Sequence, residues 1–263
     1  PWRLGRLTIR NRLVRSATAE GLSTSEGAPS PKLIKITRDL ARGGAGLIIA
    51  GSAHISSEAR ADKYTTGMDH DRLIEPLKRW CDSVHREGGI MAAQLLHCGS
   101  TCSPEILHEK QRLSGPSSMV DPVHGYQVVE LAKDEIRTIV DDYADAAGRA
   151  QTAGFDGVQI HGAHGYLTNQ FLSPYRNQRK DSYGGRLENR ARLLCQVFEA
   201  VRARVGPSFP LLVKLSVHDG FPGGVLPSEA VRVAETLDSL GIDAIEVSGG
   251  SPDGAKNGGW DHI

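Results

Sequence analysis

The feature that most constrains the fold is a repeated alternation of short apolar runs with longer amphipathic segments. The short runs are rich in β-branched residues and end at Gly or polar residues, which is typical of strands buried on both faces of a parallel sheet. The longer segments have apolar residues at helical spacing, and most of them stop at Gly. The runs are 13–14, 46–50, 90–95, 157–160, 211–215 and 244–247, and the helical segments are 31–42, 73–86, 134–153, 187–205 and 228–240. This order predicts right-handed βαβ units around a parallel sheet.

Two parallel architectures compete for this pattern. A doubly wound nucleotide-binding fold usually carries a Gly-rich turn after its first strand, but residues 16–21 here are Ser-Ala-Thr-Ala-Glu-Gly. A (β/α)8 TIM barrel needs eight units in roughly 250 residues, and six are found by residue 248. We therefore predict an α/β TIM barrel, with residues 1–263 as a single, incomplete domain whose last two units are absent from this sequence. Residues 98–131 are expected to form a long irregular loop at the carboxyl end of the third strand.

Composition excludes several classes of partner. The chain has 31 basic and 31 acidic residues, so no general attraction to nucleic acid is expected. No apolar run approaches the roughly 18 residues of a membrane span, and we expect no membrane partner and a cytoplasmic location. The four cysteines are expected to be free thiols. The exposed strand edges of an incomplete barrel favour a homo-oligomer.

Polar side chains gather where the predicted strands end. In a barrel the carboxyl ends of the strands form the active-site face, to which different strands contribute. The candidates at these ends are Ser16, Thr18, Ser52, His54, Gln94, His97, His161, His164, Tyr166, Lys214, Ser216, His218 and Ser248.

The most informative segment is His161-Gly-Ala-His164-Gly-Tyr166. Two imidazole N–H donors three residues apart can converge on one carbonyl oxygen and stabilise the negative charge that develops on it. The phenol of Tyr166 can then deliver a proton. Two alternatives remain open from the residues alone. The pair could bind a metal with His97 or His218 as a third ligand, or it could be a hydrogen-bonded structural pair.

Two further polar residues lie inside apolar strands. The amide of Gln94 offers one donor beside one acceptor, which matches the imide edge of a flavin or a uracil. Neighbouring backbone groups could satisfy it equally well. Lys214 needs an anionic partner, because lysine is rarely buried unpaired. That partner could be Asp219 or Glu246, or it could be a reduced flavin or a substrate carboxylate.

Together, three segments resemble the old yellow enzyme family of NAD(P)H:flavin oxidoreductases. They are 154–167, which contains Gly-Phe-Asp-Gly-Val-Gln-Ile-His-Gly-Ala-His-Gly-Tyr-Leu, then 170–174 and 181–190. Supporting matches at 11–18, 94–99 and 213–216 follow in the family's order, so the resemblance covers nearly the whole chain.

The resemblance implies a TIM barrel that holds FMN at its carboxyl face, accepts hydride from NADH or NADPH, and reduces activated C=C bonds such as those of enones and enoates. Tyr166 would be the proton donor, and His161 and His164 would hold the substrate carbonyl. The flavin would be contacted by Ser16, Ala17, Thr18, Ala19, Ser52, Gln94 and Lys214. Gln94 would pair with its pyrimidine edge, and Lys214 would lie beside N1 and the C2 carbonyl.

The sequence departs from the family's pattern in three places. Lys214 stands where many members have an arginine; lysine keeps the positive charge but lacks the planar fork of donors. Ala19 stands where members often carry Thr or Cys, so this side chain is not expected to tune the flavin. The family binds the FMN phosphate with the loops after strands seven and eight, and neither loop is in this sequence.

Other functions stay open beside the ene-reductase. The chain could be the barrel of a longer dienoyl-CoA or 2-enoate reductase with an iron–sulfur cluster. It could also be a degenerate barrel without flavin that acts through contacts with a partner. A metal-dependent lyase or aldolase would need several carboxylates at strand ends, and Glu246 is the only good candidate.

Overall fold

The centre of the structure is a layer of parallel strands. The computed structural model describes residues 1–103, 105–106 and 112–256. Hydrogen bonds order the sheet β12-β11-β10-β6-β4-β3, with β5 paired to β4, and every pair is parallel. Its strands are β3 (Val14–Arg15), β4 (Leu47–His54), β5 (Thr66–Gly67), β6 (Met91–Leu96), β10 (Gly157–Gly162), β11 (Leu211–Ser216) and β12 (Ala244–Ser248). All six predicted strands are therefore present in one parallel sheet.

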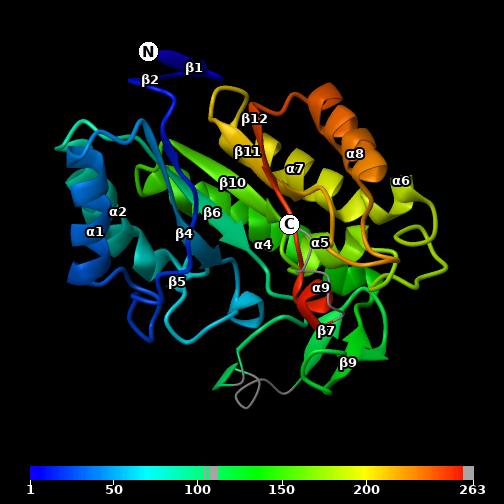
Figure 1. Cartoon of the computed structure of the whole chain (residues 1–263). Helices are drawn as coiled ribbons and strands as arrows, with labels where there is room; N and C mark the ends of the chain where they lie inside the picture. The colour runs from blue at the N-terminus through cyan, green and yellow to red at the C-terminus, as the bar shows by residue number, and fades with distance from the viewer. Residues whose placement is uncertain (104, 107–111, 257–263) are drawn as a thin grey trace.

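Helices connect the strands and flank the sheet (Figure 1). They are α1 (Pro31–Arg42), α2 (Ile74–His85), α4 (Lys133–Thr152), α5 (Leu167–Leu172), α6 (Leu187–Arg190), α7 (Arg192–Val205), α8 (Pro227–Ser239) and α9 (Pro252–Lys256), with short turns η1 (Ser57–Ala59) and η2 (Asp71–Leu73). The helix predicted over 187–205 divides into α6 and α7 at Ala191, whose backbone keeps right-handed helical angles. Within the described residues, no helix combines the length and apolar character that a membrane span requires.

Successive strand residues face two separate cores, which explains why whole runs are apolar. On the outer face, Ile48 and Val213 join the larger core together with Trp80 of α2. On the inner face, Leu47 and Leu212 belong to a second, smaller core. The sheet is therefore curled, with a filled interior on its concave side, as in the TIM barrel that the sequence predicts.

A hairpin that the sequence did not predict closes the interior at the amino ends of the strands. It consists of β1 (Trp2–Leu4) and β2 (Leu7–Ile9), which pair antiparallel. Leu4 and Ile9 are buried in the inner core. Gly5 turns the chain with φ +55°, and a Cβ there would lie 2.3 Å from a carboxylate oxygen of Asp243. The opposite end of the interior, where the strands end, is left for polar side chains.

The described part of segment 98–131 is not the irregular loop that we predicted. It contains a small sheet of β7 (Leu113–Gly115), β8 (Met119–Val120) and β9 (Gln127–Glu130) in the order β7-β9-β8. These strands are too short and too exposed to show a clear alternation, since only Val128 of β9 is buried. Arg179 fixes the small sheet by donating to the carbonyls of Pro116 and Leu131 at 2.9 and 2.7 Å.

The first and last strands of the main sheet approach each other across its concave face. Ser16, directly after β3, donates a hydrogen bond of 2.6 Å from Oγ to Oε1 of Glu246 on β12. These residues are separated by 230 positions in the chain. The polar side chains of all the strands between them are therefore brought to one place.

Candidate active site

The predicted histidine pair and tyrosine form one cluster at the end of β10. The ring centroids of His161 and His164 are 5.1 Å apart, and those of His161 and Tyr166 are 4.8 Å apart, both at steep interplanar angles. His164 has φ +61° and is the only non-glycine residue with positive φ in the described part of the chain. Such a conformation is costly and is found preferentially at functional sites. Here it turns the chain directly after the strand, so that both rings lie together.

Hydrogen bonds indicate which nitrogen of His161 carries the proton. The backbone N–H of Ala163 donates to Nδ1 of His161 at 3.3 Å, so Nδ1 is an acceptor. In the neutral ring the proton then lies on Nε2, which becomes a donor for a ligand. His164 is held at Nε2 by the hydroxyl of Ser248 at 2.6 Å.

Both imidazoles are neutral at neutral pH. Burial lowers the pKa of His161 well below the usual 6.5, and the nearby His164 and Lys214 lower it further. Burial and Lys214 also lower the pKa of His164. A neutral N–H can stabilise negative charge that appears on a ligand oxygen without giving up its proton.

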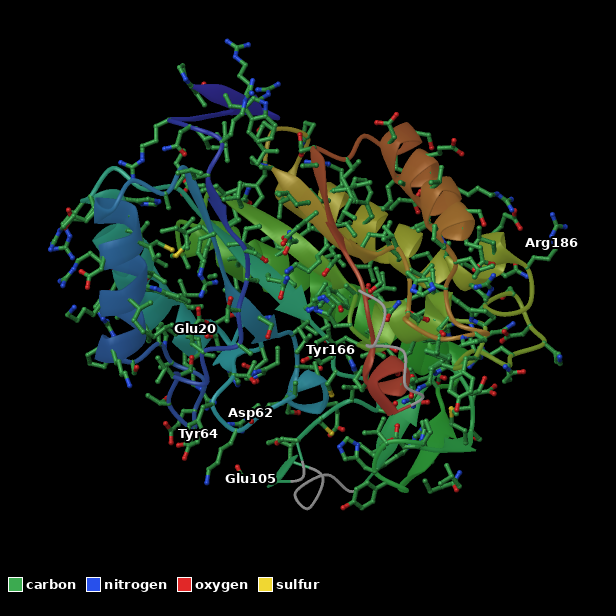
Figure 2. The ribbon with its side chains drawn as sticks, in the orientation of Figure 1. Glu20, Asp62, Tyr64, Glu105, Tyr166 and Arg186 are labelled. Atoms are coloured by element: carbon green, nitrogen blue, oxygen red, sulfur yellow. The ribbon has the colours of Figure 1, made fainter. Side chains whose placement is uncertain are left out.

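Tyr166 keeps its proton for the same reason. Burial raises the pKa of the phenol, and Cys98 and Asp62 raise it further. The ring packs against an apolar cluster that includes Cys98 and Leu96; Figure 2 labels Tyr166 near the centre of the view, with Asp62 below it. A protonated phenol beside two neutral imidazoles is an arrangement able to protonate a bound substrate.

Below the histidines, five polar side chains form a continuous network on the concave face. Lys214 donates from Nζ to Ser16 Oγ at 2.8 Å and lies 3.1 Å from Glu246 Oε1. Gln159 donates to Glu246 Oε2 at 2.8 Å, and Gln94 donates to Gln159 Oε1 at 2.7 Å. Burial favours the neutral form of Glu246, but the bonds from Ser16, Gln159 and Lys214 outweigh it and lower the pKa. The partner of Lys214 within the protein is therefore Glu246 and not Asp219.

The other predicted flavin residues are not part of this network. Thr18, Ala19 and Ser52 line a neighbouring cavity of about 200 Å³, and Ala17 packs beside the inner core. The first loop lies directly on β4, since a Cβ on Gly51 would come within 2.3 Å of the Thr18 carbonyl oxygen. The candidate residues thus fall into two groups. Three of them belong to the hydrogen-bonded network, called the floor network below, which consists of Ser16, Gln94, Gln159, Lys214 and Glu246. The others line the adjacent cavity or pack beside the inner core.

The residues of the floor network fit the polar edge of a flavin. The ammonium group of Lys214 donates to Ser16 and contacts Glu246. One of its three N–H groups is therefore left for a ligand. The amide nitrogen of Gln94 is bonded to Gln159, so its carbonyl oxygen, on the other side of the amide, can accept from a ligand. One cation and one acceptor, held side by side on a buried floor, match a ring that presents an N–H beside a carbonyl.

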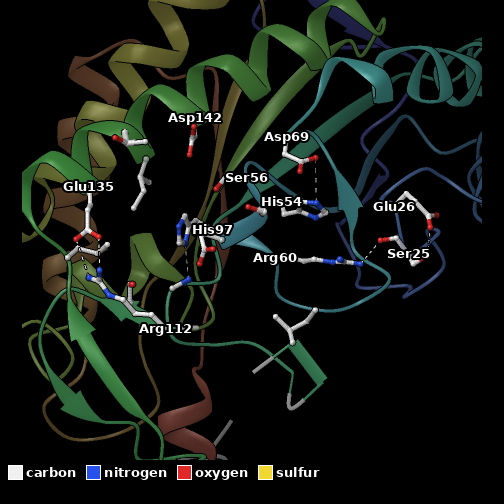
Figure 3. A pocket seen from close by; sticks show the side chains of 18 of the residues that line it. Ser25, Glu26, His54, Ser56, Arg60, Asp69, His97, Arg112, Glu135 and Asp142 are labelled. Atoms are coloured by element: carbon white, nitrogen blue, oxygen red, sulfur yellow. Dashed lines mark hydrogen bonds and ion pairs between the residues drawn. The ribbon is translucent and has the colours of Figure 1, made fainter. Parts of the chain in front are cut away.

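A larger cavity lies elsewhere in the described part of the chain. It measures about 830 Å³ and is bordered by the loop after β4, the start of segment 97–106 and the first half of α4. Figure 3 shows charged side chains around it, among them Arg60, Arg112 and Glu135. His97 lines this cavity, and its Nδ1 accepts from the N–H of Gly99 at 3.0 Å. His97 thus lines this cavity, whereas Thr18 and Ser52 line the smaller one.

The alternatives that the residues left open can now be weighed. In the described part of the chain, no group of three His, Cys, Asp or Glu side chains could hold a metal ion. The metal site with His97 or His218 as third ligand is thus not formed. Among the residues that the structure describes, no disulfide joins any of the four cysteines.

Comparison with known proteins settles the family. The family model described as the NADH:flavin oxidoreductase / NADH oxidase family matches residues 1–252. The chain belongs to this family. It is 38% identical to a metal reductase of Desulforamulus reducens over 95% of this chain and 37% of that protein. It is 34% identical to an NADPH dehydrogenase of Bacillus licheniformis over 95% of this chain and 72% of that protein.

Solved structures agree with the family assignment. The old yellow enzyme homologue of Zymomonas mobilis is 33% identical, with a TM-score of 0.85, over 93% of this chain and 71% of that chain. The resemblance to old yellow enzymes and the TIM-barrel fold class are thereby confirmed. The family is linked to FMN and to NADH or NADPH as electron donor, and the chain spans only 37% of the metal reductase's length.

The roles of two members of the floor network, Glu246 and Gln159, were not fully predicted from the sequence. Glu246 was named as a partner for Lys214, but its bonds to Ser16 and Gln159 were not foreseen. Gln159 was missed because its run, Gly-Val-Gln-Ile, looked like an ordinary buried strand. A polar residue within a strand buried on both faces was the available signal.

Proposed function

We propose that residues 1–263 are part of a single flavin-binding barrel domain of a reductase that acts on activated C=C bonds, such as those of enones and enoates. The observation that carries the proposal is the cluster of His161, His164 and Tyr166, in which the centroid of the His161 ring lies 5.1 Å from that of His164 and 4.8 Å from that of Tyr166. An enone develops negative charge on its carbonyl oxygen when a hydride is added to its β-carbon. Neutral imidazole donors and a protonated phenol are suited to that change.

Each residue has a distinct proposed role. The Nε2 proton of His161 would bind the substrate oxygen. His164 would bind it through Nδ1 if Ser248 donates its hydroxyl proton to Nε2. Tyr166 would give its phenolic proton to the α-carbon. Ser16, Gln94 and Lys214 would hold the flavin from the floor network, with residues 17–19 and Ser52 beside it. When bound, FMN supplies the hydride chemistry, which the side chains cannot provide themselves.

The size of the relatives favours a second candidate. The chain spans 37% of the metal reductase and 72% of the NADPH dehydrogenase. The barrel could thus belong to a longer reductase with an iron–sulfur cluster, as in dienoyl-CoA and 2-enoate reductases. Analysis of iron and acid-labile sulfide in the full-length protein separates the two, because a simple ene-reductase contains neither.

The test of the proposed function uses the full-length protein. FMN released by heat and a band near ~450 nm that NADPH bleaches without oxygen would establish the cofactor in this protein. Addition of 2-cyclohexenone should then restore the oxidised spectrum, whereas cyclohexanone, which lacks the C=C bond, should not. A protein that takes up no FMN, or is reoxidised by neither compound, contradicts the proposal. The first outcome would favour the degenerate barrel that acts through a partner.

A further inference from the structure

In the floor network, Glu246 determines which groups donate hydrogen bonds and which accept them. An ionised carboxylate accepts hydrogen bonds and cannot donate them. Glu246 therefore requires Gln159 to present its NH2 group, as the 2.8 Å bond to Oε2 shows. The carbonyl of Gln159 is then turned to Gln94, which must donate in turn at 2.7 Å. Both amides are buried, so a reversed orientation would leave unpaired polar atoms.

This direction decides what Gln94 offers to a ligand. Its NH2 group is engaged by Gln159, and its carbonyl oxygen accepts no hydrogen bond from within the described part of the chain. A ligand above the floor thus meets an acceptor at Gln94. A flavin ring has one imide N–H, at N3, that such an acceptor can bind.

Glu246 also sets the charge of the floor. It lies 3.1 Å from the ammonium of Lys214 and shares the hydroxyl of Ser16 with it. The pair is neutral as a whole, although its positive member is buried and its negative member is partly exposed. Negative charge that develops on a ligand near Lys214 is therefore stabilised less than it would be beside an unpaired lysine.

We propose that Glu246 is a positioning residue for the flavin, which orients the Gln94 amide through Gln159 and moderates the charge of Lys214. The proposal rests on the proposed function, since it needs FMN on this floor. It assigns a role to a strand residue that belongs neither to the histidine cluster nor to the set of residues expected to contact the flavin.

The charge part is tested by the two-electron midpoint potential of FMN in the full-length protein. Glu246→Gln leaves Lys214 without its counter-charge, which should favour the anionic reduced flavin at least tenfold. That corresponds to a rise of about 30 mV. Lys214→Met leaves Glu246 alone and should shift the potential in the opposite direction. The double variant removes both charges and should return close to the wild-type value.

The matched control is Glu235→Gln, which makes the same substitution at an exposed position of α8. It should leave the potential unchanged. Circular dichroism and thermal unfolding show whether each variant is folded. If a single variant does not fold, the double variant, which has no unpaired charge, is measured in its place. Shifts of the same sign in both single variants, or no shift in Glu246→Gln, overturn the charge part.

The orientation part is tested by binding of 3-methyl-FMN, which lacks the N3 proton. The wild-type protein should bind it about tenfold more weakly than FMN, because one hydrogen bond is lost. In Glu246→Gln the new amide can donate, Gln159 can turn, and the ratio of the two dissociation constants should fall severalfold. An unchanged ratio overturns this part. A wild-type protein that binds FMN while Glu246→Gln changes nothing refutes only the role of Glu246, whereas a wild-type protein without FMN refutes the proposed function as well.

Discussion

Two buried cations in this molecule are held by carboxylates in different ways. Arg176 donates to Asp253 and Asp121, with 2.7 Å bonds to each, and also to Ser100. Arg176 and both carboxylates are at most 4% exposed. Lys214 donates to Ser16 and Glu246, but the side chain of Glu246 is 26% exposed. The first cluster is closed on all sides, and the second opens below the histidine pair.

The difference shows how a buried charge can be assigned to structure or to function. The Arg176 cluster joins four segments of the chain and is buried on every member, so it stabilises the fold around the small sheet and α9. The Lys214 cluster keeps one ammonium proton free and stands beside an acceptor on Gln94. A charge that the protein satisfies completely fixes a loop, and one that it satisfies in part can bind.

The largest effect should come from breaking the closed cluster. Arg176→Met leaves Asp121 and Asp253 buried without a cation, which typically lowers the free energy of unfolding by about 3–5 kcal/mol. Urea unfolding of the full-length protein measures this change. Arg186→Met is the control, because the Arg186 side chain is 85% exposed, and it should leave the unfolding midpoint unchanged. Equal stability of both variants would contradict the structural role of Arg176.

On the open side, the largest effect should be on rate and not on stability. Tyr166→Phe keeps the ring packing but removes the phenolic proton, and general acid catalysis commonly contributes about 10²–10⁴-fold. Reoxidation of the reduced protein by 2-cyclohexenone should slow by at least about 100-fold, while its reduction by NADPH stays at the wild-type rate. The control is Tyr183→Phe, a tyrosine bonded to Gln196 outside the site. Equal slowing of both half-reactions would argue against a proton-donating role for Tyr166.

The closed cluster and the histidine pair above the open one should also differ in how their contributions to stability depend on pH. His161 and His164 have lowered pKa values in the fold, so the unfolded chain binds more protons than the folded chain below about pH 6.5. Stability is then complete above pH 6.5 and falls as pH drops towards the folded values, by up to about 1.4 kcal/mol per pH unit for each proton. The pKa of Asp121 is lowered from 3.8, because hydrogen bonds from Arg176 outweigh its burial. The closed cluster thus weakens only in stronger acid.

Unfolding measured between pH 5 and 7 tests this difference. His161→Asn should reduce the slope of stability against pH in that range. Asp121→Asn should lower stability without changing the slope there. An unaltered slope in His161→Asn would show that this histidine is not held neutral by its surroundings.

The smallest effects come from a matched pair of serines, one beside each cation. Ser100→Ala removes an acceptor from Arg176 and should lower the free energy of unfolding by about 1 kcal/mol, with unchanged affinity for FMN. Ser16→Ala removes the hydroxyl between Lys214 and Glu246 and should weaken FMN binding. Fluorescence titration with FMN and urea unfolding of both variants distinguish them. Equal changes in FMN affinity and in the free energy of unfolding for the two variants would contradict this distinction.

Much of this architecture could be predicted from local sequence signals. Strands buried on both faces appear as apolar runs, and helix ends are marked by Gly, as at Gly43 after α1. The histidine pair and Tyr166 were found because they lie within six consecutive residues at the end of one strand. By contrast, α5 was missed because all six of its residues are buried, so it shows no amphipathic pattern.

Contacts between distant strands could not be predicted in this way. The bond from Gln159 to Glu246 depends on how β10, β11 and β12 are aligned, and sequence periodicity does not fix that register. The same holds for Arg176, whose carboxylate partners, Asp121 directly after β8 and Asp253 in α9, share no common motif. Nor could the sequence show that the first loop passes close over Gly51 and that Thr18 and Ser52 line one cavity; their contact with the flavin stays a prediction.

The contact between Ser16 and Glu246 has a consequence for synthesis on the ribosome. Segments that are made first usually begin to fold first, so the strands up to β11 can pair while the chain is still growing. Lys214 then lacks its counter-charge, Glu246, until β12 has left the ribosome. The floor network is complete only when β12 joins the sheet, and a cofactor that arrives earlier meets an incomplete binding surface.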